Sequence, residues 1–264
     1  YVHARQHQGA WLLRIEDVDE TRTQPGAAND IQRTLESLGF EWDEQVMFQS
    51  QRNQRYAEVI DFLLQSGHAY PCACSRSEIS STGTQGIEGW IYPGSCRDGI
   101  TRGKSPRTIR LRTHDRPIQF QDLIAGPQCS RIESETGDFV IRRADGYTAY
   151  QLAVVVDDGD QGITHVVRGA DLLSSAARQI HLQQILGLPI PQYAHVPLVL
   201  DDQGRKLSKQ DRAHPVSAAK PLHSLQAACR FLYQTTVPTE VDSVEAFWKW
   251  IMAQSTSSLF QFDL

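Results

Sequence analysis

Three short segments of this sequence carry charged residues that could bind a small charged ligand. Glu16 follows a short apolar run and begins an acidic cluster, and Arg168 follows a second apolar run. The third segment, Lys206-Leu207-Ser208-Lys209, follows a glycine-containing turn. A carboxylate can pair with an ammonium group, a guanidinium with a carboxylate, and two lysines with a phosphate chain. Taken singly, each segment is more often a solvated surface, so a shared site depends on the fold.

The cysteines suggest a second kind of chemistry, because three of the five lie close together in the sequence. Cys72, Cys74 and Cys96 could supply three of the four ligands of a tetrahedral zinc site. An odd number of cysteines in a reducing compartment argues against a disulfide framework. The alternative is three free cysteines that pack as small apolar side chains. We expect Cys129 and Cys229 to be core residues of that kind.

The composition is that of a globular protein with one large domain, or with a main domain and an insertion. The 264 residues are 40% hydrophobic and 22% charged. Because no apolar run reaches about 18 residues, we expect no membrane span. The polar start lacks a signal-peptide pattern, so we expect a cytoplasmic location. The net charge of −5 argues against a protein that coats nucleic acid, although a local basic face could still bind RNA.

Strand and helix signals alternate along the chain. Apolar runs predict strands at residues 11–15, 149–156, 164–167 and 196–200, and helical spacing predicts a helix over residues 174–186. This alternation is typical of a parallel α/β sheet. Ligands collect at the carboxyl ends of such strands, where Glu16, Arg168 and the residues after position 200 would lie.

Further helices are predicted at both ends of the chain. One covers residues 31–38, and Ser50 is expected to cap another. In the tail, one amphipathic helix covers residues 222–232 and another begins near Asp242. Between residues 71 and 137, frequent glycine and proline indicate turns and short strands, which we interpret as an insertion.

Four motifs occur in an order and spacing that resemble a known family. They are Arg14-Ile15-Glu16-Asp17-Val18-Asp19, Tyr150-Gln151-Leu152-Ala153, Val167-Arg168-Gly169-Ala170-Asp171-Leu172 and Lys206-Leu207-Ser208-Lys209. Together they resemble the catalytic domain of the class I glutamyl-tRNA synthetases. The resemblance spans nearly the whole chain and is closer to the short paralogues of these enzymes, the glutamyl-queuosine tRNA(Asp) synthetases. Few residues follow Lys209, which agrees with a paralogue that lacks the long helical anticodon-binding region.

The resemblance implies an α/β fold with a class I synthetase-like Rossmann domain, a zinc-containing insertion and a short helical C-terminal region. We therefore expect four segments. Residues 1–70 would form the first part of the Rossmann domain, and residues 71–145 the insertion with the zinc site and an acceptor-side subdomain. Residues 146–195 would complete the Rossmann domain, and residues 196–264 would hold the Lys-x-Ser-Lys loop and the C-terminal helices.

The resemblance also assigns roles to individual residues. Glu16 would accept the ammonium group of L-glutamate, Tyr150 would offer its hydroxyl, and Arg168 would hold a substrate carboxylate. Lys209 would contact the ATP phosphates and assist catalysis, with Lys206 as a helper.

For the metal, the resemblance implies a structural Zn²⁺ held by Cys72, Cys74, Tyr92 and Cys96. Tyrosine is an unusual ligand because its hydroxyl ionises near pH 10, but a neighbouring Zn²⁺ lowers that pKa. His68, Asp98 or water would be the fourth ligand if Tyr92 were not.

The implied activity is activation of L-glutamate by ATP with Mg²⁺, independent of tRNA, followed by transfer to queuosine in the anticodon loop of tRNA(Asp). We expect a monomer. A fragment of a full-length glutamyl-tRNA synthetase and a non-catalytic module that binds glutamate or RNA are the alternatives. The family's His-x-Gly-His-type motif is missing from these 264 residues, and His7-Gln8-Gly9 does not replace it. On that ground we expect weak or absent activity for the chain as written.

Overall fold

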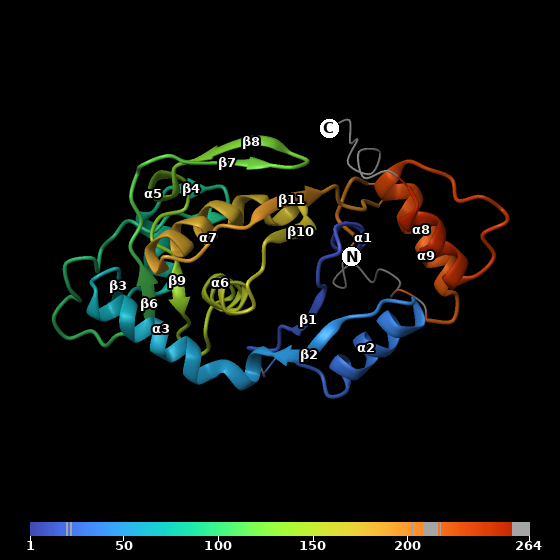
Figure 1. Ribbon diagram of the computed structural model, residues 1–264. Helices are drawn as coiled ribbons and strands as arrows, with labels where there is room; N and C mark the ends of the chain where they lie inside the picture. The colour runs from blue at the N-terminus through green and yellow to red at the C-terminus, as the bar shows by residue number, and fades with distance from the viewer. Residues whose placement is uncertain (20, 22, 202, 208–215, 217, 255–264) are drawn as a thin grey trace. The chain divides into compact units, whose positions relative to one another are not determined.

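The computed structural model describes residues 1–264 except 20, 22, 202, 208–215, 217 and 255–264. The chain divides into two compact units (Figure 1). The first unit comprises Tyr1–Ile15, Thr21–Phe48 and Val196–Leu264, and the second comprises Glu16–Glu20 and Gln49–His195.

The first unit is built around a parallel pair of strands. β1 (Leu12–Ile15) pairs in parallel with β2 (Asp43–Phe48), and α2 (Ala27–Ser37) lies between them in the chain. The strand at residues 11–15 and the helix after it are predicted from the sequence, whereas β2 lies in a segment where no strand is predicted. The remaining helices of the unit are α1 (Val2–Gln6), α8 (Pro221–Tyr233) and α9 (Val244–Met252).

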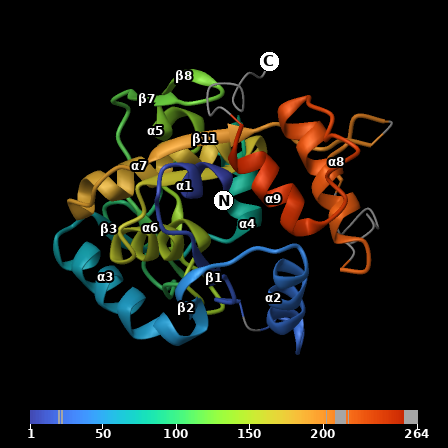
Figure 2. The same cartoon turned by 45° about the vertical axis from the view of Figure 1, so that its right-hand side comes forward.

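A small apolar core holds the first unit together. In Figure 2, α8 and α9 lie side by side, and their buried faces share a cluster with residues after α2. The chain leaves α2 through Gly39, whose φ is +74° and where a Cβ atom would lie 2.7 Å from the Trp248 ring. Trp248 in turn donates its indole N–H to the Leu38 carbonyl at 2.8 Å. Only glycine combines this left-handed backbone with so close a contact. The buried members of the cluster are Leu38, Leu225, Cys229, Val241, Phe247 and Ile251.

The second unit contains a four-stranded sheet with the strand order β10-β11-β7-β8. β11 pairs with β7 in parallel, whereas β7 and β8 form an antiparallel hairpin (Figure 1). The strands are β7 (Ile118–Asp122), β8 (Gly126–Ser130), β10 (His165–Gly169) and β11 (Gln192–Val196). The α/β class is confirmed, but the sheet is mixed and not wholly parallel.

Helices and a second sheet complete this unit. Three strands pair antiparallel in the order β3-β6-β9, and β4 and β5 form a separate short hairpin. The strands are β3 (Ala69–Cys72), β4 (Gln85–Gly86), β5 (Gly89–Trp90), β6 (Thr108–Leu111) and β9 (Val140–Arg142). The α-helices are α3 (Asn53–Gln65), α4 (Arg76–Thr82), α5 (Ile132–Glu135), α6 (Tyr150–Asp160) and α7 (Leu173–Leu186), with 3₁₀ turns η1 (Gln49–Arg52) and η2 (Ala170–Leu172).

Two strand predictions are wrong. Residues 149–156 lie mostly in helix α6, because a continuous apolar run fits a helix buried on all sides as well as a buried strand. Every residue of that helix from Leu152 to Asp157 is buried. The strand predicted at residues 196–200 lies earlier, as β11, and Leu200 forms only an isolated bridge with Lys206.

One predicted helix cap is also wrong. Ser50 does not cap α3, because its hydroxyl and its backbone N–H both donate to the Asp17 carboxylate. The helix predicted to begin near Asp242 is confirmed as α9, which Ser243 caps by accepting from the backbone N–H of Ala246 at 3.2 Å. The helices predicted at residues 31–38, 174–186 and 222–232 are confirmed as parts of α2, α7 and α8. Among the helices in the described part of the chain, none has the length and apolar character needed to cross a membrane.

Candidate active site and cysteine cluster

The acidic cluster after β1 contains carboxylates with structural partners and one, Glu16, that is exposed at the surface. Asp17 accepts from the Ser50 backbone N–H at 2.9 Å and from its hydroxyl at 2.7 Å. Asp19 pairs with Arg143 at 2.6 Å. Glu16 is exposed to solvent, although it follows directly on the buried Ile15. The prediction that a carboxylate follows the end of this strand is therefore confirmed.

Tyr150 is the first residue of α6, and its side chain is 40% exposed. Partial burial of its hydroxyl raises the pKa of Tyr150, the charge of Arg168 lowers it, and the charge of Glu16 raises it. Both charges act on the same hydroxyl, so Glu16, Tyr150 and Arg168 are brought into one neighbourhood within the second unit. Their contacts with a substrate stay predictions.

Arg168 lies on β10, and protein groups occupy part of its guanidinium. Its Nε donates to Nε2 of His195 at 3.0 Å, and one terminal nitrogen donates to Oε1 of Gln179 at 2.8 Å. The other terminal nitrogen donates to the Leu172 carbonyl at 3.2 Å. A guanidinium carries five N–H groups, so among the described residues one N–H on each terminal nitrogen of Arg168 has no acceptor. Two such groups are what bidentate binding of a carboxylate requires.

The basic segment is only partly described. Lys206 is exposed on the turn that the Leu200–Lys206 bridge closes, and it belongs to the first unit. Lys209, the predicted ATP-contacting residue, lies outside the described residues, as does Ser208.

Three cysteines and a tyrosine form a compact cluster in the second unit. The sulfur atoms of Cys72, Cys74 and Cys96 all lie within 4.8 Å of one another. The Tyr92 hydroxyl is 3.4 Å from the Cys72 sulfur and 3.7 Å from the Cys74 sulfur, and it accepts from the Cys96 backbone N–H at 2.9 Å. The sequence prediction that these four residues meet is confirmed by their positions. Among the described residues, neither His68 nor Asp98 joins this group of possible ligands.

Three of the separations within the cluster fit a tetrahedral zinc ion. With Zn–S about 2.3 Å and Zn–O about 2.0 Å, tetrahedral angles place sulfurs about 3.8 Å apart and a sulfur and an oxygen about 3.5 Å apart. The Cys74–Cys96 sulfur separation of 3.6 Å and the two distances to the Tyr92 hydroxyl match these values. Tyr92 is held there by a parallel bridge to Gly137, where a Cβ atom would lie 2.8 Å from the Tyr92 main chain.

Arg110 places a positive charge beside this cluster. Its Nε donates to the Cys72 sulfur at 3.4 Å, and its guanidinium lies over the Tyr92 ring at 4.0 Å. Burial raises the pKa of Cys72, but hydrogen bonds from Tyr92 and Arg110 outweigh that effect and lower it to about 7. Burial and the neighbouring cysteines raise the pKa of Cys74 to about 11, and burial together with Cys72 raises that of Tyr92.

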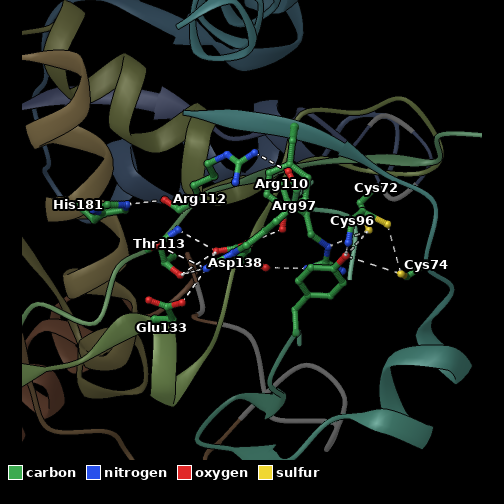
Figure 3. Close-up of polar contacts among 12 residues, drawn as sticks. Cys72, Cys74, Cys96, Arg97, Arg110, Arg112, Thr113, Glu133, Asp138 and His181 are labelled. Atoms are coloured by element: carbon green, nitrogen blue, oxygen red, sulfur yellow. Dashed lines mark hydrogen bonds and ion pairs between the residues drawn. The ribbon is translucent and has the colours of Figure 1, made fainter. Parts of the chain in front are cut away.

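A buried carboxylate lies beside the cluster and connects several of its supporting strands (Figure 3). Asp138 accepts from Arg97 at 2.6 Å, from both the backbone N–H and the hydroxyl of Thr113 at 2.8 Å, and from the Tyr70 hydroxyl. Arg110 also donates to the Asp138 carbonyl at 2.7 Å.

The two remaining cysteines lie in different environments. Cys129 is exposed on β8 and lines a cavity of about 370 Å³, so the prediction that it is a core residue is wrong. An alternating strand leaves one face to solvent, and Cys129 lies on that face. Cys229 is buried in the core of the first unit, as predicted.

Some residues around the candidate site carry no signal in the sequence. His195 and Gln179, which hold Arg168, occur in stretches without a motif, and so does Arg110 beside the cysteines. Their importance follows from contacts between strands and helices that are far apart along the chain.

A family model described as tRNA synthetases class I (E and Q), catalytic domain, matches residues 1–228. A glutamyl-Q tRNA(Asp) synthetase from Aromatoleum aromaticum is 49% identical over 95% of this chain and 79% of its own length. The protein of the same name from Geobacter sulfurreducens is 52% identical over 89% of this chain and 77% of its own length.

Among solved structures, a glutamate tRNA ligase from Elizabethkingia meningosepticum, in complex with its amino acid, matches with a TM-score of 0.67 and 27% identity. The match covers 80% of this chain and 47% of that one, so the chain spans about half the length of that structure.

The chain belongs to the class I tRNA synthetase (E and Q) catalytic-domain family, whose members are ligases. Within that family, the resemblance to the short paralogues is confirmed, because relatives 44–52% identical over most of the chain carry the name glutamyl-Q tRNA(Asp) synthetase.

Proposed function

We propose that this chain activates L-glutamate with ATP and transfers it to queuosine in the anticodon loop of tRNA(Asp). The observation that supports it most is the common neighbourhood of Glu16, Tyr150 and Arg168, which offers an anion, a hydroxyl and a cation to one small zwitterion. The names of the relatives support the choice of amino acid and of acceptor.

The three side chains would orient the amino acid by its charges. Glu16 pairs with the ammonium group, and the two remaining N–H groups of Arg168 hold a carboxylate. A carboxylate held by two N–H donors is a poor nucleophile, so Arg168 binds the side-chain carboxylate and leaves the α-carboxylate to react. Tyr150 walls the pocket and offers its hydroxyl.

In the first step, an α-carboxylate oxygen attacks the α-phosphorus of ATP and the bond to pyrophosphate breaks, which leaves glutamyl-adenylate. Lys206 and Lys209 neutralise charge that develops on the phosphates, and Mg²⁺ bound with ATP supplies further neutralisation. In the second step, a queuosine hydroxyl attacks the activated carbonyl, loses its proton and displaces AMP. Alignment of the reacting groups accounts for much of the rate, because no protein nucleophile is needed.

The decisive experiment measures glutamate-dependent exchange between ATP and pyrophosphate by the full-length protein without tRNA. It then measures transfer of labelled glutamate to tRNA(Asp) with and without queuosine. We expect exchange without tRNA and transfer only to the queuosine-containing RNA. Transfer to the 3′ end of tRNA(Glu) would instead assign the chain to glutamyl-tRNA synthetase. Glutamate binding without any exchange would indicate a non-catalytic module.

The second part of the proposal is a structural zinc ion held by Cys72, Cys74, Tyr92 and Cys96. It is supported by the donor set and by separations that fit tetrahedral coordination. Bound there, the ion would fix the chain between β3 and the segment around Tyr92 and Cys96. It would take no part in the adenylation chemistry.

We predict one zinc ion per chain in the purified protein, measured by inductively coupled plasma mass spectrometry. Cys74→Ser should reduce the zinc content severalfold, because serine is a weak zinc ligand. Cys129→Ser is the matched control, since Cys129 is exposed and lies outside the cluster, and it should keep the full content. Equal zinc in both variants would contradict the assignment.

We also retain the four-segment division at residues 70, 145 and 195, a monomeric state and a cytoplasmic location as parts of the proposal. A tRNA substrate supports the location.

A further inference from the structure

Three neighbouring strands each contribute one polar side chain to a hydrogen-bonded row that ends at Arg168. In the sheet order β10-β11-β7, Arg168 lies on β10, His195 on β11 and Asp122 on β7. β11 and β7 run parallel, with Tyr193 opposite Asp122. The sheet itself therefore sets the spacing of the three residues.

Asp122, at the end of the row opposite Arg168, is a buried carboxylate whose oxygens are hydrogen-bonded. Its side chain is 0% exposed. Its Oδ1 accepts from the backbone N–H groups of Ile124 at 3.0 Å, Ala125 at 2.8 Å and His195 at 3.2 Å. Burial raises the pKa of Asp122, but these hydrogen bonds and the one from the His195 ring outweigh that effect and lower it. Asp122 is thus an anion whose second oxygen is left for the His195 ring.

His195 connects that anion to Arg168. Its Nδ1 lies 2.6 Å from Asp122 Oδ2, and its Nε2 accepts from Arg168 Nε at 3.0 Å. The ring can do both only when neutral, with its proton on Nδ1, because the Arg168 Nε–H cannot give up its proton to act as an acceptor. Burial and the charge of Arg168 lower the pKa of His195, and together they outweigh the opposing effects of Asp122 and the Leu172 carbonyl.

We propose that Asp122 and His195 are positioning residues for substrate binding: Asp122 fixes the tautomer of His195, and His195 fixes the guanidinium of Arg168. The inference rests on the proposed function, because it gives Arg168 a substrate carboxylate to hold. Gln179, which is 2% exposed, holds the guanidinium at another nitrogen. With Nε and one N–H of each terminal nitrogen engaged, the remaining two donors are preorganised for a carboxylate.

The sharpest test is Asp122→Asn. Asparagine keeps an oxygen for the three backbone N–H groups but turns an N–H donor toward His195 Nδ1. The ring then moves its proton to Nε2, where it opposes the Arg168 Nε–H, as in the serine proteases when the aspartate of the triad is replaced by asparagine. We expect the KM for glutamate to rise about 10–100-fold, the range found when a group that orients a metal ligand is removed. The KM for ATP should stay within about twofold.

His195→Gln tests the same idea from the middle of the row. The amide can donate to Asp122 and accept from Arg168, so it should restore a KM for glutamate within about threefold of the parent. His195→Leu fills similar space without an acceptor and should raise that KM as Asp122→Asn does. If His195 had only a structural role, the glutamine and leucine variants with equal melting temperatures would have the same KM for glutamate.

Nitrogen-15 NMR of the histidine rings gives a readout that does not depend on activity. In the parent protein, His195 should show a protonated Nδ1 and an unprotonated Nε2, and Asp122→Asn should exchange the two. Asp115→Asn is the matched control, because Asp115 is an exposed aspartate that contacts Arg131 at the surface. It should change neither the spectrum nor the kinetics.

Unchanged glutamate KM in Asp122→Asn, or an Nε2-protonated ring in the parent protein, would overturn the inference. If the parent protein showed no glutamate-dependent exchange, the proposed function itself would fail. The NMR experiment would still test whether Asp122 fixes the tautomer.

Discussion

Arg168→Ala should lower kcat/KM for glutamate in ATP–pyrophosphate exchange by about 30- to 4,000-fold. The substitution removes a guanidinium with two N–H groups that no group in the described part of the chain accepts, so a bound carboxylate would lose a charged, bidentate pairing. Loss of one partner from a buried charged pair costs about 2–5 kcal/mol, and each 1.4 kcal/mol is about tenfold in rate. Arg168→Lys should not restore activity, because an ammonium lacks both the planar pair of donors and the Nε–H that His195 accepts.

Arg116→Ala is the matched control for this experiment. Arg116 is an exposed arginine in the same unit and should tolerate the change. Circular dichroism would show whether both variants are folded. A folded Arg168→Ala protein with less than about a threefold loss would remove Arg168 from the substrate site.

Asp138→Ala should destabilise the protein by about 3–5 kcal/mol, the cost of removing one partner from a buried ion pair. The alanine would leave the guanidinium of Arg97, the backbone N–H of Thr113 and the hydroxyl of Tyr70 without their shared acceptor. The Asp138 side chain is fully buried, so water cannot easily replace the carboxylate. For a chain of this size the melting temperature should fall by about 6–20 °C, measured by calorimetry of the zinc-loaded protein.

Asp61→Ala on the exposed face of α3 is the control and should shift the melting temperature by no more than about 2 °C. Burial raises the pKa of Asp138, but Arg97, Tyr70 and Thr113 outweigh that effect and lower it. A lowered pKa means that this stabilisation is present above the ordinary aspartate value and is lost as the pH falls through the lower, folded value. The difference between parent and variant should therefore be constant between about pH 5 and pH 8.

Sequence-based prediction is most accurate for sites whose residues lie close together along the chain. The spacing of Cys72, Cys74 and Cys96 and the position of Glu16 after an apolar run need only short-range information, and both predictions agree with the structure. The strand prediction at residues 149–156 is wrong because this element is buried on every side. Its apolar residues therefore show no spacing that could distinguish a helix from a strand. Tyr150 therefore lies in the first turn of helix α6 and not on a strand, although the motif that contains it is recognised correctly.

The sequence predicts least where function depends on pairing between distant strands. Asp122 lies in a segment that the glycine pattern marks as part of an insertion, yet its strand pairs with β11 and reaches His195. Neither the register of that pairing nor the neutral state of a buried histidine can be derived from residue types alone.

The triple anchoring of Arg168 has a consequence for the choice of amino acid. If Arg168 holds the substrate carboxylate as proposed, its contacts with His195, Gln179 and the Leu172 carbonyl would keep it from shifting to follow a shorter ligand. Aspartate is shorter than glutamate by one carbon–carbon bond, about 1.5 Å. An aspartate with its ammonium group on Glu16 would not reach Arg168 with its side-chain carboxylate. The fixed position of Arg168 would therefore select for the length of the glutamate side chain.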